Sequence, residues 1–411
     1  MEETLNLSGQ QLEVLPDLTA PGPLWLLAFA NRLTALPSSI GALERLEGLV
    51  VTDNALESLP EQLRDCAALH TLQAARNQLT TLPDLPSLRT LDVSTNPLGT
   101  LPASISTLTH LEHLDLSRCG LTSLPESIGR LSSLRTLTLD HNPITALPEA
   151  LGALKQLEIL SLGDTALTTL PALPSRLRWL RLDGCPLVRV PPSLSALSSL
   201  ERLDLARCGL VDAAGIPDCQ TLNLFDNALS SLPASLWSLR SLVHLSAGGN
   251  HLTALPPGEH PRLQVLELSG NALHRIALPR LPQLTRLDLS NNPLDLPPRG
   301  LHRLRQLITL DLSNTGLRWV SPRLCALRAL AHLDLYGDPI GQLPPELCEL
   351  PSLRTLHLSA RPMHTLPRRW LASMSLETLS VSGIRMPSEP KMLRLLTPQE
   401  ILSRVCENIQ A

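Results

Sequence analysis

The sequence predicts an α/β solenoid in which a parallel β-sheet of about 18 strands lines one face and short helical or irregular segments return along the other. Three observations predict this fold class. Leucine recurs with a period of mostly 23 residues along nearly all of the 411-residue chain. Only 2% of the residues are aromatic, so the core has to consist of aliphatic side chains in many equivalent positions. A small polar residue recurs at a fixed place in each repeat.

Each repeat opens with a short strand, as the segment from Leu134 to Asn142 illustrates. Leu137 and Leu139 alternate with polar residues at the two-residue period of a β-strand. We therefore expect the leucines to face the core, and neighbours such as Thr138 to face the opposite side of the sheet.

A polar position, here called the ladder position, follows each strand. A short polar side chain there can bond to backbone groups of the turn that would otherwise be buried without partners. The ladder position falls at Gln10, Asn31, Asn54, Asn77, Asn96, Cys119, Asn142, Thr165, Cys185, Cys208, Asn227, Asn250, Asn271, Asn292, Thr315, Asp338, Arg361 and Ile384. The last two residues do not suit it, which predicts an irregular ladder toward the C-terminus.

The two ends of a solenoid need caps. The second repeat is unusually apolar around Trp25 and Phe29, as expected of a buried N-terminal end. At the other end, Thr397 is suited to be a helix N-cap, with Pro398 at the first helical position and Glu400 at the third. We expect residues 1–387 to form the solenoid and residues 388–411 a C-terminal helical cap.

The pattern LxxLxLxxNxLxxLPxxIxxLxxL, followed over roughly residues 3–387, resembles the leucine-rich-repeat family. That resemblance implies a right-handed horseshoe whose concave sheet binds a partner protein. The 23-residue form with Leu124-Pro125 and Ile128 is similar to the plant-intracellular and Ras-scaffold subtype, which also occurs in bacteria. Shortened units, such as the one containing Leu170 to Pro174, resemble repeats of secreted bacterial effectors.

Composition argues against several classes of partner. The formal net charge is −4, which leaves no basic surface for nucleic acid. No stretch reaches the roughly 20 apolar residues that span a bilayer, and the N-terminus lacks a secretory signal pattern. The eight cysteines form no CxxC pair and are expected to be reduced. The sequence thus predicts a cytoplasmic monomer without membrane insertion, or alternatively a protein that a bacterium exports into a host cell.

Aromatic and charged residues gather in the outward positions of the middle strands. Trp and Tyr are common binding hot spots, which makes this strip the preferred candidate for a partner-binding patch. Its residues are Trp179, Arg181, Asp183, Arg202, Asp204, Arg207, Phe225 and Asp226, and Tyr336 is a further aromatic candidate. The alternative is that the arginines and aspartates pair across the sheet and that Trp179 covers their stems.

Four consecutive repeats carry an acidic residue between their two strand leucines: Glu267, Asp288, Asp311 and Asp334. Like charges on neighbouring strands are unfavourable, so a basic partner would relieve this acidic column. The alternative is that Leu-Asp-Leu-Ser is simply a common form of the repeat, with Arg286 and His332 neutralising the column locally.

No catalytic motif is present: the sequence lacks a phosphate-binding glycine loop, an HExxH zinc motif and a GxSxG nucleophile motif. We therefore expect no enzyme activity, cofactor or metal. Two functions are the main candidates, and a structural array without a dedicated partner is a third. The first is a protein-interaction module or scaffold in intracellular signalling. The second is a bacterial effector that captures a host protein without the ligase domain that some similar effectors carry, because only five residues follow Cys406.

Overall fold

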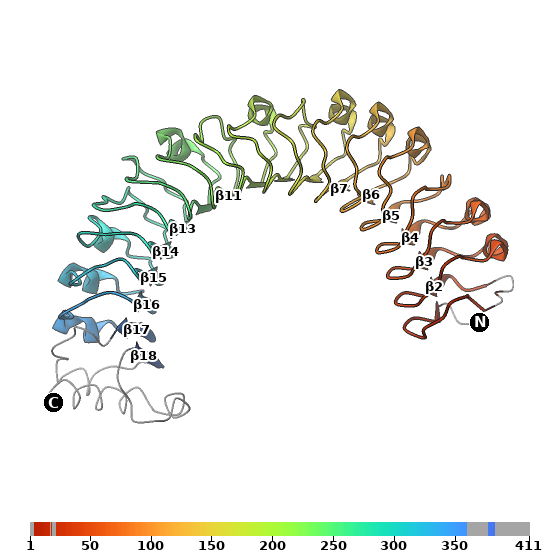
Figure 1. Cartoon of the computed structure of the whole chain (residues 1–411). Helices are drawn as coiled ribbons and strands as arrows, with labels where there is room; N and C mark the ends of the chain where they lie inside the picture. The colour runs from red at the N-terminus through yellow and green to blue at the C-terminus, as the bar shows by residue number, and fades with distance from the viewer. Residues whose placement is uncertain (1–3, 17, 19–21, 360–376, 383–411) are drawn as a thin grey trace. The chain divides into compact units, whose positions relative to one another are not determined.

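The computed structural model describes residues 4–16, 18, 22–359 and 377–382. The chain divides into two compact units. Unit 1 comprises Met1–Cys208 with Gly215–Pro217, and unit 2 comprises Gly209–Ala214 with Asp218–Ala411. Within each unit, repeats of one strand and one return segment stack side by side, with the strands on the inner, concave side (Figure 1).

Ten described strands of unit 1 pair in chain order, and every pair is parallel. They are β1 (Thr4–Asn6), β2 (Trp25–Leu27), β3 (Gly48–Val50), β4 (Thr71–Gln73), β5 (Thr90–Asp92), β6 (His113–Asp115), β7 (Thr136–Thr138), β8 (Ile159–Ser161), β9 (Trp179–Arg181) and β10 (Arg202–Asp204). Their shortness follows from the repeat, since only one leucine and its two neighbours stay extended before the chain turns.

Unit 2 contains eight described strands, which again pair in chain order and in parallel. They are β11 (Thr221–Asn223), β12 (His244–Ser246), β13 (Val265–Glu267), β14 (Arg286–Asp288), β15 (Thr309–Asp311), β16 (His332–Leu335), β17 (Thr355–Ser359) and β18 (Thr378–Ser382). The predicted solenoid of about 18 parallel strands is therefore confirmed.

All helical return segments in the described ranges are 3-10 helices. They are η1 (Ser38–Ala42), η2 (Glu61–Asp65), η3 (Ala103–Thr107), η4 (Glu126–Arg130), η5 (Glu149–Ala153) and η6 (Pro192–Ala196) in unit 1, and η7 (Ala234–Ser238), η8 (Leu301–Arg303), η9 (Pro322–Ala326) and η10 (Pro345–Glu349) in unit 2. Most follow the proline of a Leu-Pro pair, and a segment of five residues is too short for a stable α-helix. The expected short helical segments thus take this tighter form.

The leucines of the repeat fill the core. Both strand leucines of the repeat at Leu137 and Leu139 are fully buried, and so are Leu151 and Leu154 of the return segment. Burying such a side chain stabilises the fold by about 1.5–3 kcal/mol. Because every repeat contributes the same set, the core continues from repeat to repeat within each unit.

Asn142 shows what the ladder position does. Its Nδ2 donates to the carbonyl oxygens of Leu116 and Leu139, each at 2.8 Å, and its Oδ1 accepts from the backbone N–H of Leu121 at 2.9 Å. Cys119 replaces asparagine in the preceding repeat, and its Sγ lies 3.3 Å from the carbonyl oxygen of Val93. The side chain therefore ties two repeats together through otherwise unpaired backbone groups.

The residue before the ladder position has a left-handed backbone, and in most repeats it is not glycine. Arg118 and Arg207 have φ of 56° and 55°, whereas Gly249 and Gly270 occupy the same place with φ of 63° each. This residue, here called the rim residue, lies where the chain leaves the sheet.

Several predictions concern the chain ends. Trp25 lies against Gly48 on the next strand, where a Cβ atom would come within 2.3 Å of the indole ring. Trp25 also meets the His70 ring edge to face at a centroid distance of 6.3 Å. These contacts place Trp25 in the packing of the N-terminal repeats, whereas the expected burial of Phe29 is wrong, since this residue is 42% exposed. Arg361, Ile384 and the C-terminal cap at residues 388–411 lie outside the described residues.

Candidate protein-binding surface

Two rows of side chains stand on the solvent side of the strands. In β9, Trp179 and Arg181 flank the buried Leu180. The parallel register places Trp179 beside Arg202 and Arg181 beside Asp204 on β10. The outward positions identified in the sequence therefore form continuous rows within this unit.

The charged centre of the predicted patch is already paired. Arg181 Nε donates to Asp183 Oδ1 at 2.5 Å, and its Nη1 donates to Asp140 Oδ2 at 3.0 Å. Arg207 Nη2 donates to Asp183 Oδ2 at 2.6 Å. We call these four residues the Asp183 network. Burial acts to raise the pKa of Asp183, but the hydrogen bonds from the two arginines outweigh it, so this pKa is lowered.

Sequence reasoning missed Asp140 as a member of this network. Asp140 lies two repeats before Asp183 and occupies the same position, directly after the second strand leucine. Gly163 holds that position in the repeat between them, and a Cβ atom there would lie 2.7 Å from Asp183 Oδ1. A glycine between two aspartates in equivalent positions was the available signal, because it leaves room for Arg181 to reach both.

Trp179 and Arg202 are exposed residues of the unit 1 patch that lie outside the Asp183 network. The Trp179 side chain is 40% exposed, and Arg202 in register beside it is also exposed. An indole that leaves this much surface in water provides apolar area for a partner, and an adjacent guanidinium provides directed hydrogen-bond donors.

Phe225, Asp226 and Tyr336 belong to unit 2. Phe225 follows β11, is 45% exposed and passes close to Gly248, where a Cβ atom would lie 3.2 Å from its Cδ2. Asp226 is exposed as a rim residue. Tyr336 is 48% exposed at the end of β16. In unit 2, Phe225 and Tyr336 thus expose their rings beside the strands they follow.

The acidic column is in register. Strand pairing aligns Glu267 with Asp288, Asp288 with Asp311 and Asp311 with Asp334. Each aspartate also has a local role, since its Oδ1 accepts from the backbone N–H two residues later; for Asp311 that N–H belongs to Ser313, at 2.8 Å. The column therefore combines turn stabilisation with an uninterrupted row of carboxylates.

Basic side chains meet only the ends of the column among the described contacts. Glu267 lies 3.4 Å from His244 Nε2 and 3.5 Å from Arg286 Nε, and Asp334 lies 2.8 Å from His357 Nδ1. Arg286 thus takes the role expected of it, whereas His357 rather than His332 contacts Asp334.

In the middle of the column, the pKa of Asp311 is raised. Burial is the main cause, and the neighbouring carboxylates of Asp288 and Asp334 add to it, while the hydrogen bonds from Ser313 oppose it. A cation placed over this part of the column would favour the ionised carboxyl groups.

Two buried cysteines lie in settings that disfavour nucleophilic chemistry. Burial raises the pKa of Cys119 to about 11 and that of Cys208 to about 12. In the ranges that the structure describes, no three His, Cys, Asp or Glu side chains lie close enough together to hold a metal ion. No helix among the same residues has the length and apolar character to cross a membrane.

Family models for leucine-rich repeats match three segments of the chain. The family model "Leucine rich repeat" matches residues 86–144, and the model "Leucine Rich repeats (2 copies)" matches residues 132–175 and 261–300. Among curated proteins, the mouse leucine-rich repeat and calponin homology domain-containing protein 1 is 35% identical over 116 residues, which are 26% of this chain and 16% of that protein. The rat PH domain leucine-rich repeat protein phosphatase 1 is 32% identical over 112 residues, or 25% of this chain and 7% of that protein. The chain therefore matches only a small part of these relatives.

Solved structures resemble the chain over a much greater length. YopM from Yersinia enterocolitica is 30% identical with a TM-score of 0.62, and the match covers 86% of this chain and 77% of that one. A leucine-rich-repeat protein of Leptospira interrogans is 24% identical with a TM-score of 0.60, covering 97% of this chain and 94% of that one. The second similarity concerns the fold alone.

Proposed function

The chain belongs to the leucine-rich-repeat proteins, and from this premise we propose that it is a non-enzymatic interaction module that holds a partner protein against the concave face of its sheet. The observation that carries the proposal is the exposure of Trp179, Phe225 and Tyr336, at 40%, 45% and 48%, on or beside the strands. The fold buries aliphatic side chains and does not need these rings in solvent. Aromatic residues of this kind dominate many protein interfaces.

The acidic column indicates the charge of one part of the partner. Asp288 and Asp311 lie in register without a basic side chain at ion-pairing distance among the described contacts. A segment rich in lysine or arginine would complement them and speed association. We therefore propose that the partner presents a basic segment to unit 2.

For unit 1, we propose that Trp179 and Arg202 make the principal contacts. The charges of Arg181, Asp183 and Arg207 are engaged with one another, so these residues support the surface rather than make the principal contacts, although the Arg207 side chain is 49% exposed. The acidic column of unit 2 and the Trp179–Arg202 pair of unit 1 are proposed as two separate contact regions.

The biological setting belongs to the proposal as well. A cytoplasmic, monomeric scaffold in a signalling pathway is the first version, supported by Leu-Pro repeats that resemble the Ras-scaffold subtype. Export by a bacterium into a host cell is the second, supported by the shortened repeats and by 30% identity to a Yersinia protein over 86% of the chain. A secretion assay in the source organism separates the two.

The binding proposal is tested by affinity capture with mass spectrometry from the native cytosol. The test variant carries Trp179→Ala, Arg202→Glu and Phe225→Ala. The matched control carries Val188→Ala, Arg189→Glu and Val211→Ala, which alter two exposed apolar side chains and one exposed arginine outside the strands. Circular dichroism checks that both variants are folded.

We expect at least one protein that the wild type and the control retain and that the test variant loses, with a reduction of about thirtyfold or more in affinity. A variant with Asp288→Asn and Asp311→Asn should weaken the same partner less. Equal recovery of all partners by the test variant would contradict the placement of the site on this face.

A further inference from the structure

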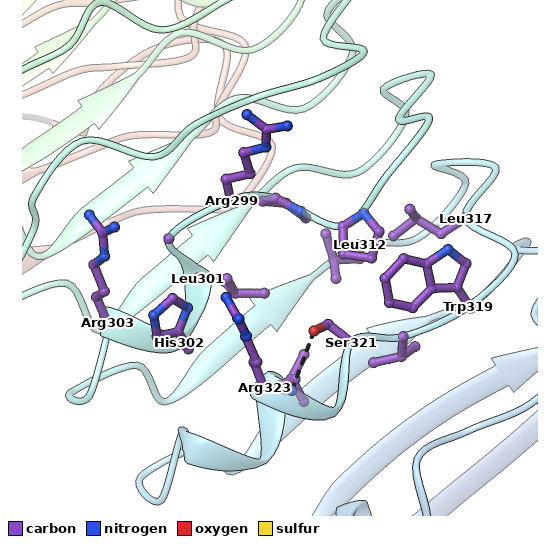
Figure 2. Close-up of a pocket in the computed structure, with 14 residues that line it drawn as sticks. Arg299, Leu301, His302, Arg303, Leu312, Leu317, Trp319, Ser321 and Arg323 are labelled. Carbon is purple, nitrogen blue, oxygen red and sulfur yellow. Dashed lines mark hydrogen bonds between the residues drawn. The ribbon is translucent and has the colours of Figure 1, made fainter.

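A groove lies away from the strand face, between the return segments of three successive repeats in unit 2. Its main hollow has a volume of about 470 Å³, and an adjoining hollow of about 250 Å³ shares Pro297, Arg299 and Trp319 with it. Figure 2 shows Trp319 at one end of the main hollow and three arginines around the other. We call it the Trp319 groove and define it by Pro297, Arg299, Arg303, Trp319 and Arg323.

A departure from the repeat sequence explains the hollow. In an ordinary repeat, a leucine five residues after the ladder position points into the core, as the buried Leu147 does after Asn142. In the repeat that begins at Asn292 this place is taken by Pro297, whose short ring is only half-buried. Leu296 before it is 39% exposed instead. The missing leucine side chain leaves room at the surface.

The following repeat adds an aromatic wall. Trp319 lies four residues after the ladder position at Thr315, where the repeat of Asn142 has the small residue Ala146. Its side chain is 46% exposed and is one of the residues that line both hollows. An apolar side chain from another molecule could pack against the exposed part of this indole.

The charged side chains that line the groove are all basic. Arg299, Arg303 and Arg323 line the main hollow and are all exposed. No aspartate or glutamate lines either hollow. In the described part of the chain none of the three arginines forms an ion pair, whereas Arg275 at the margin is paired with Asp295 at 3.3 Å. Like charges gathered in this way repel one another, so the fold alone does not call for them.

The backbone beneath the arginines is fixed. The N–H of Arg299 donates to the carbonyl oxygen of Ile276 at 2.9 Å, and the carbonyl oxygen of Arg299 accepts from Leu278 at 2.9 Å. Gly300 directly precedes the three-residue η8 and takes a left-handed φ of 88°. A preformed site of this kind loses little conformational entropy when a ligand binds.

We propose that the Trp319 groove binds an acidic peptide segment of a partner protein. An apolar side chain of the segment enters the hollow beside Trp319, and its flanking carboxylates pair with the three arginines. Arginine suits this role, because its planar guanidinium can hold a carboxylate through two hydrogen bonds. The groove is separate from the strand face, so this inference does not depend on the function proposed above.

The test is selection of random dodecapeptides displayed on phage against the full chain, followed by fluorescence anisotropy with the enriched peptides. One variant carries Arg299→Glu, Arg303→Glu and Arg323→Glu, and a second carries Trp319→Ala. A glutamine triple at the same arginines removes the charge without adding repulsion. The matched control carries Arg240→Glu, Arg262→Glu and Arg328→Glu, three exposed arginines outside the groove.

We expect enriched peptides to combine aspartate or glutamate with one apolar residue. Their affinity should fall by about tenfold or more in the glutamate triple and roughly thirtyfold in Trp319→Ala, with less than about threefold change in the control. The variant with Trp179→Ala, Arg202→Glu and Phe225→Ala should bind them normally, which separates failure of this proposal from failure of the other.

Two results would overturn the inference. Selection of peptides without acidic enrichment would remove the charge argument, and acidic peptides that bind all variants equally would place their site elsewhere. A single-stranded oligonucleotide that binds the wild type but not the glutamate triple, in the absence of peptide binding, would replace the proposed ligand class with nucleic acid.

Discussion

The Asp183 network and the acidic column place charged residues near equivalent positions of the repeat but use them differently. In the network, arginine and aspartate alternate, and Arg181 reaches carboxylates on both sides at 2.5 and 3.0 Å. In the column, four acidic residues follow one another in register, and in the described part of the chain basic groups contact only its ends. Where the signs alternate, the fold neutralises its own charges; where they repeat, charge remains for a partner.

The largest effect that tests this comparison is expected for Asp183→Ala. The substitution leaves Arg181 and Arg207 without their shared carboxylate, and we expect a loss of about 1–2 kcal/mol in the free energy of unfolding at pH 7. This loss of stability is smaller than for a fully buried ion pair because both arginines are partly exposed. Urea unfolding followed by circular dichroism measures it, with the exposed Glu61→Ala as control.

The pH dependence of this difference has a defined sign. Because the folded pKa of Asp183 is lowered, its contribution is present above the unfolded carboxyl pKa of about 3.9 and is lost as the pH falls through the folded value. The difference in free energy of unfolding between wild type and Asp183→Ala should therefore become smaller in acid. If this difference in free energy stayed constant down to the lowest pH at which the protein folds, packing and not charge would account for the cost of the substitution.

A smaller effect of opposite sign is expected for Asp311→Asn in the column. The amide oxygen can still accept from the N–H of Ser313, while the repulsion from Asp288 and Asp334 is removed. We expect a gain of about 0.5 kcal/mol in the free energy of unfolding at pH 7. Because the folded pKa of Asp311 is raised, the wild type loses stability as the pH rises from the usual carboxyl range through that raised value.

The gain from Asp311→Asn should accordingly disappear in acid, where the wild-type carboxyl group is protonated. Unfolding curves of both proteins at neutral and acidic pH measure it. Asp311→Ala serves as the control, since it removes both the charge and the turn hydrogen bond. Destabilisation by Asp311→Asn at neutral pH would show that the carboxylate is needed by the fold rather than left for a partner.

The smallest effect concerns salt. Added sodium chloride should reduce the benefit of Asp311→Asn by a few tenths of a kcal/mol, because repulsion along a partly exposed row is screened. The cost of Asp183→Ala should change less, since the Asp183 side chain is only 8% exposed. Equal salt dependence of the two variants would remove the distinction between the closed network and the open column.

Much of the fold was predictable because its determinants are local. A leucine alternation of two residues fixes which side chains of a strand are buried, and the ladder position fixes where the strand ends. Asn142 illustrates the second rule, since its side chain bonds to the backbone of Leu139 in its own repeat and of Leu116 and Leu121 in the preceding one. The 3-10 form of the return segments was less evident, because proline and short length favour it only together with the spacing between repeats.

The candidate surface was predictable as a set of positions but not as a set of contacts. Arg181 pairs with Asp140, which is 41 residues away, and this choice depends on the space that Gly163 leaves open. The Trp319 groove escaped sequence reasoning for a related reason. Pro297 is plainly visible in a leucine position, but whether a hollow follows depends on how the neighbouring repeats pack around it.

The rim residue affects how the sequence of such a repeat array can evolve. A left-handed backbone costs a side-chain-bearing residue roughly 1 kcal/mol relative to glycine, and this chain accepts that cost at Arg118 and Arg207 while using glycine at Gly249 and Gly270. Exchange at this position leaves the leucine rows and the ladder untouched. Each repeat therefore carries one site where new recognition chemistry can be tried independently of the neighbouring residue that secures the backbone.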